Sequence, residues 1–216
     1  MSNLMDYLDW RGDLTFREAP FNEVDNLILA QLVYVEFAGI VPAPGEEGTI
    51  TVKEACELFF AAHDRKEIME RVSMTKTAAF VLEKMAQTER FCNAQLFGYI
   101  NDISKEEQSQ FSVVCVRLDD KSIYVSFSGT DNTIVGWREN FNMGYLSETP
   151  GQLKAVDYLN HINVMGNCVL EVTLVVGGYS HNCTCAVACK NEVADEHSDF
   201  LAVYGIYAGN ALELAA

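Results

Sequence analysis

Ser180 is the residue whose sequence surroundings most clearly suggest chemistry. It stands in Gly178-Tyr-Ser-His-Asn182, directly after the apolar run Glu171–Val176. A Gly-x-Ser-x-Gly string at a sharp turn from a strand into a helix exposes a nucleophilic serine in α/β-hydrolases, and the N–H after the serine stabilises an oxyanion. Asn182 replaces the last glycine, so the string by itself also fits a serine that caps a helix.

A serine nucleophile needs a base, and in this architecture a carboxylate and then a histidine follow the serine in the chain. The histidines are His63, His161, His181 and His197. We expect His63 on the surface of a helical region, His161 at a helix end and His197 in an acidic loop. None of these places marks a general base, so the sequence identifies neither the acid nor the base of a triad.

Cysteine spacing argues against a metal site. The seven cysteines are Cys56, Cys92, Cys115, Cys168, Cys183, Cys185 and Cys189. The last three lack the paired Cys-x-x-Cys spacing typical of zinc sites, so we expect free thiols. We expect no cofactor either, because no Walker or dinucleotide glycine string is present. An odd cysteine count without a signal peptide favours a cytoplasmic location.

Composition narrows the class of partner. The 216 residues are 49% hydrophobic, enough for a sizeable core, and 15 basic against 31 acidic residues give a net charge of −16. Such a charge repels phosphate backbones, which excludes nucleic acid as an expected partner. No apolar run approaches the roughly 20 residues that span a bilayer.

The first half of the chain has mainly helical patterns. Apolar residues at helical spacing predict helices over Phe21–Phe37 and Thr75–Thr88. Thr51-Val-Lys-Glu54 resembles a capping box that opens a further helix, and Pro42–Gly48 is a loop by composition. We therefore expect residues 1–100 to form a helical N-terminal region of a single domain.

Residues 101–216 have patterns typical of an α/β core. Phe111–Leu118 and Ser122–Phe127 predict a hairpin around Asp-Asp-Lys, and Gly151–Asn160 predicts a helix. Glu171–Val176 predicts a buried central strand, and Phe200–Tyr204 predicts another. With a helix beginning in the Cys183–Cys189 stretch, strands and helices alternate, which predicts a mostly parallel sheet.

Several strings resemble one family. They are Asp6-Tyr-Leu-Asp-Trp-Arg-Gly-Asp-Leu-Thr-Phe16, Pro20-Phe-Asn-Glu-Val-Asp-Asn-Leu-Ile-Leu29, Gly129-Thr-Asp-Asn-Thr-Ile-Val-Gly-Trp-Arg-Glu-Asn-Phe-Asn142 and Ser147-Glu-Thr-Pro-Gly-Gln-Leu-Lys-Ala-Val156. Over about residues 4–180 the chain resembles the Mbeg-like group. These are bacterial, lipase-like α/β-hydrolases of unknown function, distantly similar to class 3 lipases.

The resemblance implies an α/β-hydrolase-like, lipase-like fold in which Ser180 attacks an acyl ester or thioester. It also implies that the backbone N–H groups of Thr130 and His181 stabilise the oxyanion, and Trp137 is expected to pack. Ser128 stands where the family usually has arginine. After Ser180 the match weakens, which predicts a C-terminally incomplete core and an inactive hydrolase, or a hydrolase-fold protein that only binds a ligand or partner. An exposed sheet edge would then favour a homo-oligomer.

Overall fold

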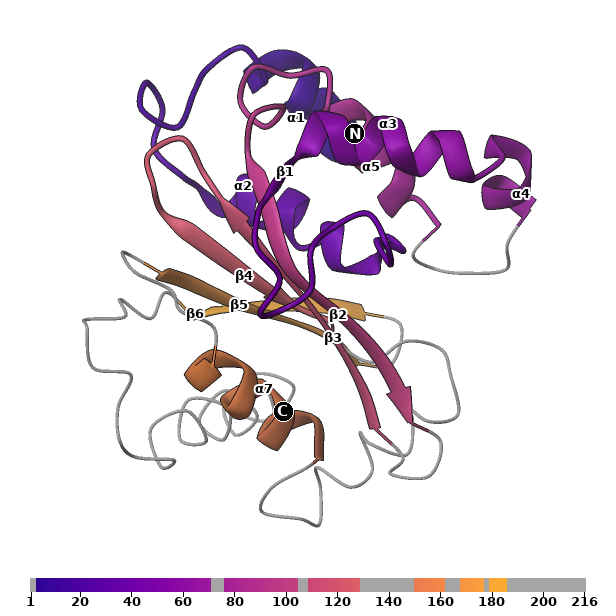
Figure 1. The fold of residues 1–216 in the computed structure, drawn as a ribbon. Coiled ribbons are helices and arrows are strands. Elements are labelled where there is room, and N and C mark those ends of the chain that lie inside the picture. The colour runs from indigo at the N-terminus through magenta and orange to yellow at the C-terminus, as the bar shows by residue number, and fades with distance from the viewer. Residues whose placement is uncertain are drawn as a thin grey trace.

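The computed structural model describes residues 3–70, 76–104, 109–128, 150–161, 168–176 and 179–185. Its centre is a six-stranded sheet in the order β1-β2-β3-β4-β5-β6, with helices on both faces (Figure 1). The strands are β1 (Ile50–Thr51), β2 (Gln95–Ser104), β3 (Ser109–Arg117), β4 (Ile123–Phe127), β5 (Cys168–Val176) and β6 (Tyr179–Cys185). The fold is therefore mixed α/β, as predicted at that level.

Helices from the first 85 residues form one layer. They are α1 (Leu4–Arg11), α2 (Glu23–Leu29), the 3-10 turn η1 (Leu32–Tyr34), α3 (Val52–Ala62), α4 (Arg65–Glu70) and α5 (Ala78–Met85). The capping box of Thr51 and Glu54 is confirmed at the start of α3. The helix predicted over Phe21–Phe37 is wrong in length, because α2 ends at Leu29 and only a 3-10 turn follows.

The prediction of a mostly parallel sheet is wrong. Among the described strands only β4 and β5 run parallel, and every other neighbouring pair is antiparallel. The cause is local, since β3 and β4 are joined by a short turn, which permits only the predicted antiparallel hairpin. β2 was not expected and runs across residue 100, where the core was expected to begin.

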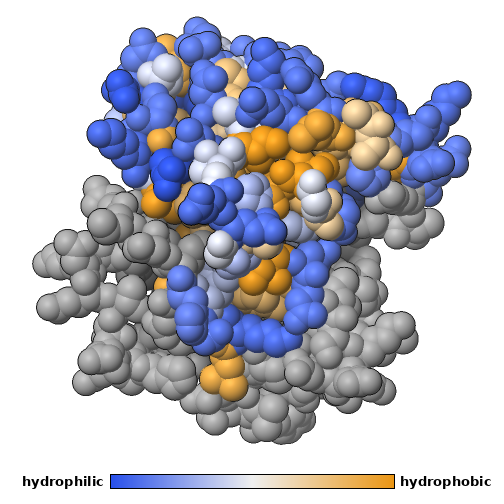
Figure 2. Space-filling model, in the orientation of Figure 1, coloured by the Kyte–Doolittle hydropathy of each residue, from blue (hydrophilic) through white to orange (hydrophobic). Residues whose placement is uncertain are grey.

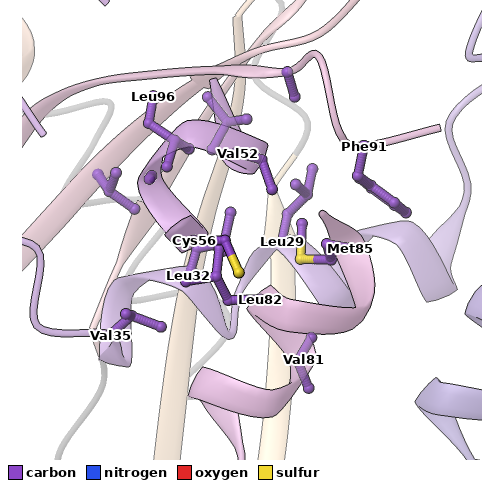
Figure 3. Close-up of a cluster of buried hydrophobic side chains, with 14 of the residues drawn as sticks. Leu29, Leu32, Val35, Val52, Cys56, Val81, Leu82, Met85, Phe91 and Leu96 are labelled. Carbon is purple, nitrogen blue, oxygen red and sulfur yellow. The ribbon is translucent and has the colours of Figure 1, made fainter. Parts of the chain in front are cut away.

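The sheet separates two hydrophobic cores. Alternate residues of a strand face opposite sides, so Val114 and Tyr124 join the core under the N-terminal helices, whereas Val113 and Val125 join the other. The N-terminal core fills the space between α2, α3, α5 and the sheet (Figure 3). The second core lies under α7 (Pro150–His161), which confirms the helix predicted over Gly151–Asn160 and connects β4 to β5 in the chain.

A buried ion pair holds the N-terminal segment to the rest of the domain. The Arg90 guanidinium donates to the Asp25 carboxylate (Nε to Oδ1, 2.7 Å), and both side chains are fully buried. Nη2 donates to the same carboxylate, both terminal nitrogens also donate to carbonyls of the 14–20 segment, and Cζ lies 4.0 Å from the centroid of the Phe16 ring. One arginine thus satisfies the carbonyls of an irregular loop that the core encloses.

Hydrophilic side chains cover most of the N-terminal layer on the face drawn in Figure 2, with a patch of apolar residues between them. Trp10 is 74% exposed, which is unusual for so large an aromatic side chain. Within the described residues, no helix combines the length and the apolar character needed to cross a membrane.

Candidate functional site

Ser180 lies in β6, where it pairs with Val175 of β5, and His181 pairs with Leu174. The predicted turn from a strand into a helix is therefore wrong. The chain turns back along β5 as a second strand, which also includes Cys183 and Cys185 of the stretch expected to begin a helix. A two-residue Gly-Gly connection between β-type runs is a hairpin signal, so the sequence around Gly177-Gly178 also favours a hairpin.

The parallel pair β4–β5 determines where the loops of the site begin. Phe127, the last residue of β4, pairs with Val172, and β5 continues to Val176. Because the strands are parallel, the segments that follow them leave from one edge of the sheet. We call this the carboxyl edge. Ser180 follows β5 there, whereas Thr130 and Trp137, which follow β4 in the chain, lie outside the described residues.

Polar side chains gather at the carboxyl edge, on the face of the sheet that the N-terminal helices cover. The Oγ of Ser112 donates to Oδ1 of Asn101 (2.6 Å), and the Asn101 amide donates to the Glu36 carboxylate (3.1 Å). The hydroxyls of Ser126 and Ser128 are buried and have no hydrogen-bond partner among the residues that the structure describes. Unsatisfied buried hydroxyls are rare, so they mark this end of β4 as unlike an ordinary core strand.

Helix α7 is tied to the sheet by polar contacts as well as by packing. The Tyr158 hydroxyl donates to the carbonyl of Gly98 (2.6 Å), at the irregularity in β2, and lies 3.2 Å from Sγ of Cys115. Lys154 pairs with Asp102 of β2 (2.7 Å). The first turns of α7 therefore lie beside the end of β2, near the carboxyl edge.

The two described histidines outside β6 lie at the ends of helices. His63 follows α3, where its ring stacks on Phe59 and its Nδ1 is 3.0 Å from the Phe59 carbonyl. His161 ends α7, just before the chain enters β5 from the opposite edge. His197 lies outside the described residues. The rings of His63 and His161 are each held by contacts within their own helix.

Burial lowers the reactivity of the described cysteines outside β5 and β6. Burial raises the pKa of Cys115 to about 12 and, together with the nearby Glu83 carboxylate, that of Cys56 to about 11. Cys92 is half-buried, and burial raises its pKa less. Among the side chains that the structure describes, no group of three potential ligands could hold a metal ion. Cys189 lies outside them.

We predict a graded reaction of these thiols with iodoacetamide at pH 8. The thiolate is the nucleophile, and each unit of pKa lowers its population about tenfold. Cys92 should therefore react first, Cys56 more slowly and Cys115 last, as measured by peptide mass spectrometry over time. In about 8 M urea, which should unfold the protein, the three alkylation rates should converge. Native modification of Cys115 as fast as that of Cys92 would contradict this placement.

These features define an α/β protein in which two parallel strands, within an otherwise antiparallel sheet, bring their following segments to one edge. The chain belongs to the Mbeg1-like family, whose model matches residues 85–207, more than half of the chain. The match includes β2 to β6 and continues past Ser180, further than the motif resemblance, while the N-terminal strings at 6–29 lie outside it. No curated protein and no solved structure matches the chain.

Proposed function

We propose that the protein is a serine hydrolase of the lipase or esterase type, acting on an acyl ester or thioester. Ser180 is the nucleophile, and the backbone N–H groups of Thr130 and His181 stabilise the oxyanion. The proposal includes a lipase-like α/β-hydrolase fold, a cytoplasmic location and an acyl substrate as the small-molecule partner. An exposed sheet edge would allow two copies of the chain to associate.

The parallel pairing of β4 with β5 is the observation that carries the proposal. It starts the segment containing Gly129 and Thr130 at the same edge as the end of β5, beside which Ser180 stands. In α/β-hydrolases the nucleophile and an oxyanion donor come from segments that follow neighbouring strands of the sheet. Membership in the Mbeg1-like family, over residues that include both strands, supports the same assignment.

The chemistry would be acyl transfer through a serine ester. The Ser180 hydroxyl attacks the acyl carbon, its proton passes to a base, the alcohol or thiol leaves, and water releases the acid. His63 and His161 are held by contacts within their own helices, and neither has a described contact that would make it the base for Ser180. Without a base, a hydrolase retains only the acceleration from oxyanion contacts and binding, so we expect slow turnover.

A fluorophosphonate probe tests the proposal. An activated serine forms a covalent adduct with it, which intact-protein and peptide mass spectrometry locate. We expect the adduct on Ser180, its loss in Ser180→Ala and its persistence in Ser122→Ala, a control in the exposed turn before β4. Absence of labelling in the wild type, or equal labelling in Ser180→Ala, would refute the nucleophile.

A second candidate, a hydrolase-fold protein that binds a ligand without turnover, is favoured by one observation. Ser180 and His181 lie in the ladder between β5 and β6, rather than at the start of a helix whose free N–H groups would face an oxyanion. Binding of a short acyl ester measured by calorimetry, with no release of acid over many hours, would support this candidate against the first.

A further inference from the structure

A cavity of about 350 Å³ lies between the loop before β1 and the hairpin of β2 and β3. Residues of the 43–49 loop form one wall, and Phe97, Gly98 and Arg117 form the other. Pockets that bind small molecules usually measure about 300–1,000 Å³, so this cavity suits a small ligand. Arg117 pairs with Ile123, the first residue of β4, so the cavity lies away from the carboxyl edge and from Ser180.

Hydrogen bonds hold the loop wall of the cavity in shape. The Glu46 N–H donates to the Ala43 carbonyl (3.1 Å), and the Ala43 N–H donates back to the Glu46 carboxylate (2.7 Å). The base of the loop is joined to β2, because the Tyr99 N–H donates to the Pro42 carbonyl (3.0 Å). The wall is therefore in place before a ligand enters, which reduces the entropy that binding costs.

The hairpin wall contains the irregularity of β2. The pairing register shifts between Phe97 and Ile100, and Gly98 has φ 65°, a conformation that residues with a Cβ rarely adopt. From the α7 side, the Tyr158 hydroxyl donates to the Gly98 carbonyl (2.6 Å) and holds the bulge in place. Bulges redirect side chains and are frequent beside active sites, so this one marks the wall as more than a plain strand.

Arg117 supplies the cavity with a positive charge and with unused hydrogen-bond donors. Its Nη1 donates to Oε1 of Gln95 (3.2 Å), and its Cζ lies 5.1 Å from the centroid of the Phe97 ring. No carboxylate among the described residues forms an ion pair with it, although the chain has 31 acidic and 15 basic residues. A guanidinium has five N–H donors in a fork that matches a carboxylate, so most of them remain for a ligand.

The rest of the lining narrows the kind of anion that fits. The Glu46 carboxylate is held by the N–H of its own loop, whereas Phe97 and Pro44 give the cavity apolar surface. A small hydrated anion would leave that surface uncovered. A flat aromatic body covers it, because aromatic rings pack well against one another. The lining therefore favours a carboxylate that is attached to an aromatic ring.

We propose that this cavity binds a small aromatic carboxylate, whose charged group contacts the Arg117 guanidinium while its ring packs against Phe97 and Pro44. The site is separate from Ser180 and does not depend on whether Ser180 is a nucleophile. The proline- and glycine-rich loop Pro42–Gly48 then has a role in binding, as one wall of the site.

Calorimetric titration of the full chain with benzoate tests the proposal. We expect saturable binding of benzoate. Benzamide, which lacks the charge, and acetate, which lacks the ring, should each bind about tenfold more weakly or worse, because each loses one of the two contacts. Absence of saturable benzoate binding, or equal affinity for either of the other two compounds, would overturn the proposal.

Variants of Arg117 test the contact itself. Arg117→Met should weaken benzoate binding about tenfold or more, and because Arg117 is exposed the melting temperature should stay near that of the wild type. Arg117→Lys keeps the charge but not the planar fork, so its affinity should fall between the two.

Arg17→Met is the matched control for the loss of one positive charge. Arg17 is also exposed and its guanidinium donates to a neutral acceptor, the Asp119 carbonyl, but it does not line the cavity. Benzoate affinity should therefore stay at the wild-type value in Arg17→Met. Equal weakening in Arg17→Met and Arg117→Met would indicate general charge attraction and overturn the site, as would unchanged affinity in Arg117→Met.

Discussion

Replacing Arg90 by methionine is expected to lower the free energy of unfolding by about 3–5 kcal/mol, because it leaves the Asp25 carboxylate buried without its cation. Asp25 would keep hydrogen bonds from Tyr7 and from the Asn22 N–H, but no charge partner. The carbonyls of the 14–20 segment would lose their donors as well. Urea unfolding followed by circular dichroism measures the loss, which is a large share of the roughly 5–15 kcal/mol typical of a domain.

Arg65 provides the matched control for this prediction. Its guanidinium makes a two-point contact with Glu83 (2.7 and 2.6 Å), but the Arg65 side chain is 56% exposed. An exposed pair usually contributes less than about 1 kcal/mol, so Arg65→Met should cost far less than Arg90→Met. Equal losses in the two variants would show that burial of the Arg90–Asp25 pair does not set its importance.

Gly12→Ala is expected to lower the free energy of unfolding by about 1–3 kcal/mol through overpacking. Gly12 has φ −68°, a value that alanine adopts freely, so backbone conformation predicts no penalty. A Cβ there would lie 2.3 Å from the Leu8 carbonyl oxygen and 2.5 Å from Cγ2 of Thr88. The added methyl group requires α1 to shift away from the segment after α5. Thermal unfolding measures the resulting loss of stability.

The double variant Gly12→Ala with Thr88→Ser checks the cause. Serine keeps a hydroxyl for the Met85 carbonyl, to which Thr88 donates, and removes the Cγ2 that the new methyl would meet. The double variant should recover part of the stability lost in Gly12→Ala. A stabilising effect of Gly12→Ala, as expected for alanine in an unobstructed helical conformation, would contradict the close approach.

Both predictions concern the N-terminal strings that carry much of the motif resemblance. Tyr7, Gly12 and Phe16 come from the first string, and Asn22 and Asp25 from the second. In the structure they surround Arg90 or the helix ends beside it. Their role is therefore to hold an irregular segment in a packed layer, a requirement of the fold rather than of the chemistry at the carboxyl edge.

Local patterns predicted the local structure well. Asp119-Asp120-Lys121 between two apolar runs gave the β3–β4 turn, where Lys121 adopts φ 70° and its N–H donates to the Leu118 carbonyl. The Thr51–Glu54 pair gave the start of α3. In both cases the residues that specify the structure lie within four positions of one another, so a single sequence contains the whole signal.

The rest depends on partners distant in the chain. β2 contains Gly98, Asn101 and Asp102, residue types that are uncommon in strands, so the sequence did not predict a strand there. The Gly98 carbonyl accepts from a tyrosine of α7, the Asn101 amide donates to Glu36, and Asp102 pairs with Lys154. No local pattern in the sequence reveals these distant partners. For Ser180 two local signals competed, the Gly-x-Ser string and the Gly-Gly hairpin. The hairpin prevails because β6 extends the sheet along the whole second half of β5.

The one parallel pair among the described strands also orders the assembly of the domain in time. β2, β3 and β4 follow one another through short connections, whereas Phe127 and Val172 are neighbours in the sheet although 45 positions separate them in the chain (172 − 127). Contacts between distant residues form late, because closing a long loop costs entropy before any pairing rewards it. We therefore expect the first 128 residues to condense as a nucleus and the strand beside Ser180 to dock last, onto a surface already made.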